Sequence, residues 1–157
     1  MIREGALARF AVHGFNHTSF TVASLDRAIL FFCDLLGFEL ISRAPRGQAL
    51  IERMTAIAGA DVEIAFVRGP GHTIELIEYC APADRSASRA RLCDAGAAHV
   101  ALDVDDVPAA VAGAQAHGVR PVGEIIVIDD GPNRGRQVVY LKGPDGFVIE
   151  FIGERAA

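Results

Sequence analysis

The sequence has no tryptophan, and aromatic residues make up only 7% of its 157 residues. It also has no block of basic residues, since its 15 lysines and arginines are scattered among 20 aspartates and glutamates and the net charge is −5. Proteins that bind nucleic acid or anionic membranes usually concentrate lysine and arginine in a patch. We therefore expect neither nucleic acid nor a membrane as a partner.

Cysteines and long apolar runs are also scarce. Cys33, Cys80 and Cys93 are odd in number and form no C-x-x-C pair, which favours three buried free thiols in a reducing compartment over disulfides. The stretch 1–15 carries charges and lacks the apolar centre of a signal peptide. No run is long enough to cross a bilayer. These absences predict a cytoplasmic protein. The length of 157 residues and the hydrophobic content of 51% predict a single domain over residues 1–157.

What the sequence does have is an internal repeat. The segment "HTSFTVASLDRAILFFCDLLGFEL", starting at His17, aligns with "HVALDVDDVPAAVAGAQAHGVRPV", starting at His99. Each begins with histidine, alternates like a strand, and continues with apolar residues at helical spacing. A cap-like cluster stands where each helix should begin, with Ser24 in the first copy and Asp105, Asp106 and Pro108 in the second. Each copy therefore predicts a strand followed by a helix.

The two copies also end alike. The segment "TIELIEY" (73–79) matches "VIEFIG" (148–153), with Glu75 aligned on Glu150, and a Gly-Pro turn precedes each. Two more strands fit before each final strand, at about 39–42 and 62–67 in the first copy and at 122–128 and 136–142 in the second.

Each copy is thus predicted to be a βαβββ module. The first module covers about 14–80 and the second about 96–153, and a partly helical linker at about 81–95 joins them. Strands and helices mixed in this way predict the α+β class.

Four polar residues recur at matching places in the two modules. Because side chains alternate along a strand, His17, Glu75, His99 and Glu150 can all point away from the helices and converge if the two sheets form one cup. Each residue alone has a plainer explanation, as an ordinary polar or solvated strand residue, but the repetition favours a site. Two imidazoles and two carboxylates suit one divalent metal ion such as Zn, Ni, Co, Mn or Fe(II).

The repeated pattern resembles the vicinal oxygen chelate superfamily over residues 17–153. Its most specific parts are "FFCDLLGFEL" and "GPDGFVIEF". This superfamily includes glyoxalase I, methylmalonyl-CoA epimerase, extradiol dioxygenases and bleomycin-resistance proteins. The resemblance implies a U-shaped mixed sheet around the metal with helices outside, a small-molecule substrate and a homodimer. It places the ligand positions on His17, Glu75, His99 and Glu150.

Three functions follow from the resemblance. The first is a glyoxalase-type or epimerase-type lyase or isomerase, in which the metal stabilises an enediolate or enolate while Glu150 or Glu75 transfers the proton. The second is an Fe(II) extradiol dioxygenase, which needs only two histidines and one carboxylate. The third is a drug-sequestering resistance protein, which needs no metal.

Details of the sequence rank these functions. "YLKGPDGFVIE" resembles most of the extradiol signature, but Gly143 departs from it, and no histidine lies in "DDGPNRGRQ" upstream. Retention of all four ligand candidates argues against drug sequestration. The first function is therefore preferred, with glyoxalase I and methylmalonyl-CoA epimerase as the nearest types.

Two arginines are candidates for substrate binding. Arg134 and Arg136 lie in the loop "DDGPNRGRQ", where they could hold an anionic group of the substrate. The alternative is a solvated turn with two exposed arginines. The glyoxalase stretch containing Lys-Tyr-Ser-Leu is absent, which argues against glutathione as part of the substrate.

Overall fold

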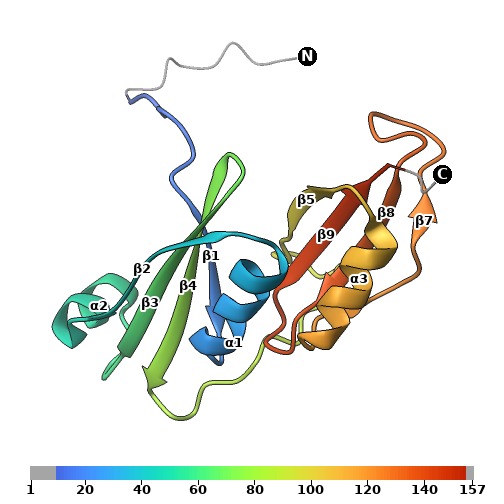
Figure 1. Cartoon of the computed structure of the whole chain (residues 1–157). Coiled ribbons are helices and arrows are strands. Elements are labelled where there is room, and N and C mark those ends of the chain that lie inside the picture. The colour runs from blue at the N-terminus through green and yellow to red at the C-terminus, as the bar shows by residue number, and fades with distance from the viewer. Residues whose placement is uncertain (1–9, 155–157) are drawn as a thin grey trace.

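A computed structural model of the chain describes residues 10–154 and contains two modules side by side (Figure 1). Residues 1–9, on which the expectation of no signal peptide partly depends, lie outside this range. The first module consists of β1 (Thr18–Val22), α1 (Leu25–Ile29) with a π-helical continuation η1 (Leu30–Leu35), β2 (Glu39–Arg46), α2 (Gln48–Thr55), β3 (Asp61–Gly69) and β4 (His72–Ala81). The second consists of β5 (Val100–Val104), α3 (Val107–Ala116), β6 (Arg120–Pro121), β7 (Ile126–Val127), β8 (Gln137–Lys142) and β9 (Val148–Gly153).

Each module forms its own mixed sheet. The strand orders are β1-β4-β3-β2 and β5-β9-β8-β6, and β7 also pairs with β8. The first strand of each module runs parallel to the last, with Ser19 opposite Glu75 and Ala101 opposite Glu150. β1 and β5 therefore occupy equivalent sheet edges, and the α+β class is confirmed.

A single hydrophobic core joins the two modules. α1 with η1 and α3 pack on one face of their sheets and against each other, burying Phe31, Phe32, Leu76 and Phe151 almost completely. Gly113 permits close contact between the helices, because a Cβ atom there would lie 2.4 Å from Cδ1 of Leu35. The helices thus leave the opposite faces of both sheets, which we call the cup faces, available for a site.

The cup face of the first sheet is partly covered by α2. This helix packs Ile51 against Val62 and Ile64 of β3 in a small second core. α2 has no counterpart in the second module and was not predicted from the sequence. It gives the two otherwise similar modules different cup faces.

The predicted helix caps are confirmed. The Ser24 hydroxyl accepts a hydrogen bond from the backbone N–H of Arg27 at 3.4 Å. The Asp106 carboxylate accepts one from the N–H of Ala109 at 2.9 Å. Each bond satisfies a donor that the first helical turn leaves without a partner.

Three local predictions were wrong. The linker predicted as partly helical at about 81–95 contains turns and no helix, and in one turn the Asp94 carboxylate accepts a hydrogen bond from the N–H of Arg91. The strand expected over 122–128 is reduced to Ile126–Val127, after Gly123 interrupts the pairing. Cys80 and Cys93 are exposed rather than buried, although both are free thiols.

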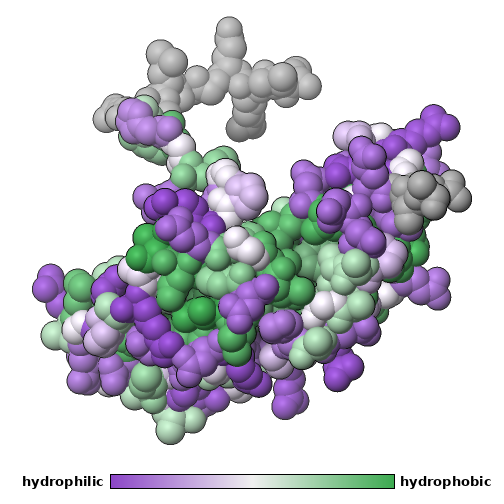
Figure 2. Space-filling view, viewed as in Figure 1, coloured by the Kyte–Doolittle hydropathy of each residue, from purple (hydrophilic) through white to green (hydrophobic). Residues whose placement is uncertain are grey.

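Apolar residues are unevenly distributed over the surface. In Figure 2, hydrophobic residues spread across the middle of the view, and hydrophilic residues dominate both ends and the lower rim. Among the described residues, no helix is long and apolar enough to span a membrane.

Candidate functional site

The first histidine and glutamate of the repeat lie together on the cup face of the first sheet. Nε2 of His17 is 3.4 Å from Oε2 of Glu75. Nδ1 of His17 is 2.7 Å from the side-chain oxygen of Asn16, which can only accept a hydrogen bond, so this bond forms in the tautomer that has a proton on Nδ1. The edge of the imidazole meets the ring of Phe66, with centroids 5.7 Å apart.

The second module repeats this arrangement. Nε2 of His99 is 3.2 Å from Oε2 of Glu150. Tyr140, opposite Glu150 in the sheet, meets the imidazole edge with ring centroids 5.1 Å apart, as Phe66 does in the first module. The repeat seen in the sequence is therefore a repeat of side-chain geometry.

Both carboxylates are largely shielded from solvent. The Glu75 and Glu150 side chains are 14% and 12% exposed, and each lies on the face opposite the hydrophobic core. Tyr140 distinguishes the two: burial, and then the charge of Glu150 and a hydrogen bond to it, raise the pKa of the Tyr140 phenol. The phenol is thus protonated at neutral pH, and Glu150 has a neighbouring donor that Glu75 lacks.

One chain brings each pair together but does not unite the two pairs. Within residues 10–154, no group of three or more histidine, cysteine, aspartate or glutamate side chains is close enough to hold one metal ion. The pairs lie on separate sheets, with the packed helices on the opposite faces (Figure 1). Each pair is therefore half of the ligand set predicted from the sequence. We call them the first and second half-sites.

A second glutamate of β4 has a different task. Glu78 is three residues beyond Glu75, so its side chain lies on the helix face. Its carboxylate accepts a hydrogen bond from the backbone N–H of Leu25 at 2.7 Å, at the start of α1. This role was not predicted from the sequence. The two acids in "TIELIEY" are three residues apart, and an odd number of residues along a strand places side chains on opposite faces of the sheet.

The two candidate arginines differ in their surroundings. Nη2 of Arg136 bonds Oδ1 of Asp103 at 2.6 Å and lies 3.4 Å from the carbonyl oxygen of Ile152, on the cup face of the second sheet. Arg134 lies in the exposed turn before it, where its backbone N–H bonds the carbonyl of Gly131. The partner Asp103 was not singled out from the sequence.

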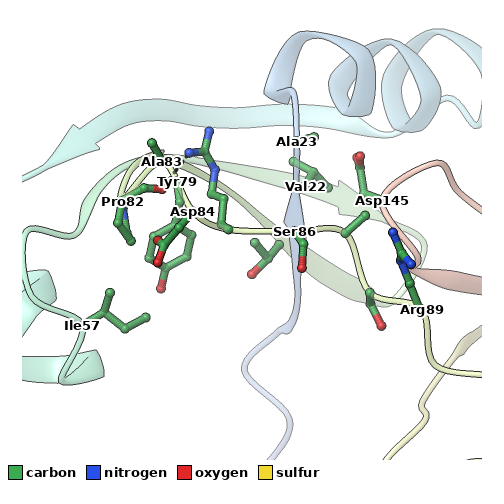
Figure 3. A pocket seen from close by; sticks show the side chains of 14 residues that line it. Val22, Ala23, Ile57, Tyr79, Pro82, Ala83, Asp84, Ser86, Arg89 and Asp145 are labelled. Carbon is green, nitrogen blue, oxygen red and sulfur yellow. Dashed lines mark hydrogen bonds between the residues drawn. The ribbon is translucent and has the colours of Figure 1, made fainter.

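A groove of about 1030 Å³ lies at the linker (Figure 3). Tyr79 and Ile57 form one side, and Arg89 and Asp145 lie toward the other, with Ser86 of the linker between them. The four ligand candidates do not line it. The chemistry predicted from the repeat therefore lies elsewhere on the surface.

Comparison with known proteins identifies the family. The Glyoxalase/Bleomycin resistance protein/Dioxygenase superfamily matches residues 14–151, and the chain belongs to it. It is 36% identical to a 2-epi-5-epi-valiolone epimerase from an Actinomyces species, covering 97% of this chain and 84% of the relative. It is 26% identical to a probable lactoylglutathione lyase from Vibrio cholerae, covering 92% and 94%.

A solved structure gives the same answer for the fold. A glyoxalase family protein from Bacillus cereus superposes with a TM-score of 0.80 and 30% identity, covering 96% of this chain and all of that one. At the level of the family, the relatives fit an epimerase or lyase type.

Proposed function

We propose that this protein is a metal-dependent epimerase, isomerase or lyase that moves a proton on a carbon next to a carbonyl group of a small molecule. The observation that carries the proposal is the twofold occurrence of a histidine and a shielded glutamate with side chains 3.2–3.4 Å apart. Membership of the superfamily, with relatives named as an epimerase and a lyase, supports it.

The side chains of each half-site fit a divalent cation. In the tautomer with the proton on Nδ1 of His17, Nε2 presents a lone pair toward the carboxylate of Glu75. Two donor atoms that each bind a cation at about 2.1 Å lie roughly 3–3.4 Å apart, which is the observed separation. The hydrogen bond to Asn16 would also fix the ring, as outer-shell partners of metal ligands do. Mixed imidazole and carboxylate donors do not select one ion among Zn, Ni, Co, Mn and Fe(II).

The residues divide the work as follows. His17, Glu75, His99 and Glu150 would hold the metal, which when bound supplies a Lewis acid for the oxygens of the substrate. Glu150 or Glu75 would take the proton from carbon and return it, because a shielded carboxylate beside the substrate is a suitable base. Tyr140, which lies opposite Glu150 in the sheet, would orient that carboxylate with its hydroxyl.

Completion of the site requires a second chain in this proposal. Each half-site is next to an edge strand of its sheet, β1 or β5, and an edge strand can pair with another strand edge. A twofold dimer that places β1 of one chain beside β5 of its partner would unite the first half-site of one chain with the second half-site of the other, twice. Two copies would then give two four-ligand sites.

Mixing two inactive variants tests both the ligands and the dimer. His17→Ala and His99→Ala should each abolish activity and metal binding alone. When the two variants are refolded together in equal amounts, half of the dimers contain one chain of each variant. Each mixed dimer has one intact site out of two, so about a quarter of the wild-type activity should return. If each chain closed its own site, mixing would restore nothing, and the shared-site proposal would fail.

The reaction class is tested directly with candidate substrates. We expect the metal-loaded protein to epimerise 2-epi-5-epi-valiolone, followed by NMR as exchange of the proton at the epimerised carbon in D₂O. Formation of lactoylglutathione from methylglyoxal and glutathione is the competing outcome suggested by the second relative. Ring cleavage of a catechol by the Fe(II) form under oxygen, with no proton exchange, would contradict the proposal.

A further inference from the structure

The two cup faces differ one row away from the metal half-sites. Asp103 lies opposite Ile152, two residues along the strands from the row of Glu150, which is about 7 Å. Arg136 reaches across β9 from the start of β8 to bond Asp103. An ion pair therefore crosses the cup face beside the second half-site.

The matching row of the first module carries no charge. Alignment of the repeats places Thr21 on Asp103, Ile77 on Ile152 and Val62 on Arg136. Val62 is 1% exposed in the small core beneath α2, with Ile77 packed against it. The repeat has kept its histidine and glutamate in both copies but has a charged, uncovered pair in only one.

The pair has the chemistry of a site for hydroxyl groups. The Asp103 side chain is 78% exposed and keeps free lone pairs, and the Arg136 side chain is 32% exposed and keeps further N–H donors. Because the two charges cancel, the pair gives little attraction for an anion. A hydroxyl group, which both donates and accepts, fits neighbouring acceptor and donor groups at once.

We propose that Asp103 and Arg136 form a subsite for the hydroxyl groups of a neutral polyhydroxylated substrate, one row from the reacting carbon. This inference rests on the proposed function, and it replaces the anionic substrate group that the sequence suggested for Arg136.

Two ketones that differ only in their hydroxyl groups test the subsite. One is an inosose, a cyclohexanone with a hydroxyl on each remaining carbon, and the other is cyclohexanone with a single hydroxyl next to the carbonyl. In the metal-loaded dimer, Asp103→Asn and Arg136→Gln should weaken inosose binding, measured by saturation-transfer NMR and calorimetry, by about ten-fold or more. The same variants should bind the monohydroxylated ketone as the wild type does.

A matched control is available in the first module. Asp26 and Arg43 form an ion pair at 2.5 Å, with side chains 75% and 35% exposed, on the helix side of the first sheet. Asp26→Asn should leave binding of both ketones unchanged, and metal content should be equal in all variants. Equal losses for both ketones in Asp103→Asn, or no loss for either, would overturn the subsite.

The binding measurement separates this inference from the proposed function. Hydroxyl-dependent binding that Asp103→Asn removes, without any proton exchange in the wild type, would sustain the subsite and defeat the reaction class. Proton exchange in the wild type that is unchanged in Asp103→Asn and Arg136→Gln would support the reaction class and defeat the subsite.

Discussion

Two glutamates of β4, three residues apart, have different roles because their side chains lie on opposite faces of the sheet. Glu75 lies beside His17 on the cup face, whereas Glu78 bonds the first N–H of α1 on the helix face. A buried backbone donor left without a partner costs about 1–3 kcal/mol. The same substitution at the two positions should therefore have opposite consequences.

Glu78→Ala should lower the free energy of unfolding by about 1–3 kcal/mol and leave metal affinity unchanged. Glu75→Ala should leave the stability of the metal-free protein nearly unchanged, because its partner His17 is a third exposed, and should sharply reduce metal affinity. Urea unfolding and titration with Zn²⁺ measure the two quantities. Loss of stability in Glu75→Ala without loss of affinity would contradict the ligand assignment.

Tyr140 is the residue that makes the two half-sites unequal. Tyr140→Phe copies Phe66 of the first module and removes only the hydroxyl beside Glu150. Removing an outer partner of a metal ligand typically costs 10–100-fold in affinity. We expect about a ten-fold loss of metal affinity in this variant, measured by competition with a fluorescent chelator.

The reciprocal change provides the control for Tyr140. Phe66→Tyr adds a hydroxyl near Glu75, while the imidazole of His17 keeps its bond to Asn16. Equal metal affinity in Tyr140→Phe and the wild type would show that the phenol does not orient Glu150.

At the scale of elements, the packing of α3 on η1 depends on one glycine. A side chain at Gly113 would enter the space of Leu35, whose Cδ1 is 2.4 Å from the Cβ position. Gly113→Leu should destabilise the protein by about 1–3 kcal/mol through overpacking. The double variant with Leu35→Ala should recover part of this loss in thermal unfolding, because the two positions share one space. Purely additive effects would show that the contact is not the cause.

The elements also show what the sequence could and could not reveal. Strand alternation and the repeat are local patterns, so they predicted the caps at Ser24 and Asp106 and the faces of Glu75 and Glu150. α2 was missed because its short amphipathic segment has no copy in the second module. The ion pair of Asp103 with Arg136 was missed because it joins residues 33 positions apart. Whether the half-sites meet depends on how sheets are placed, which no local pattern specifies.

At the scale of the whole molecule, the two modules depend on each other for burial. One core includes residues of both sheets and of all the helices on their inner faces. Calorimetric unfolding should therefore show one transition, with equal calorimetric and van't Hoff enthalpies. A fragment of residues 10–98 should fail to fold alone, as judged by near-UV circular dichroism, because it would expose Phe31 and its neighbours. Two separate transitions would contradict this dependence.

The contact between Gly113 and Leu35 also bears on where the repeat came from. A single βαβββ unit would have left the flank of its helix bare in water, and a repeat unit that cannot bury its apolar face alone needs a neighbour. A half-length chain of one module would therefore need a copy of itself to cover that flank. In the joined chain that flank is interior, and Gly113 of the second copy stands where the repeat alignment places Phe31 of the first.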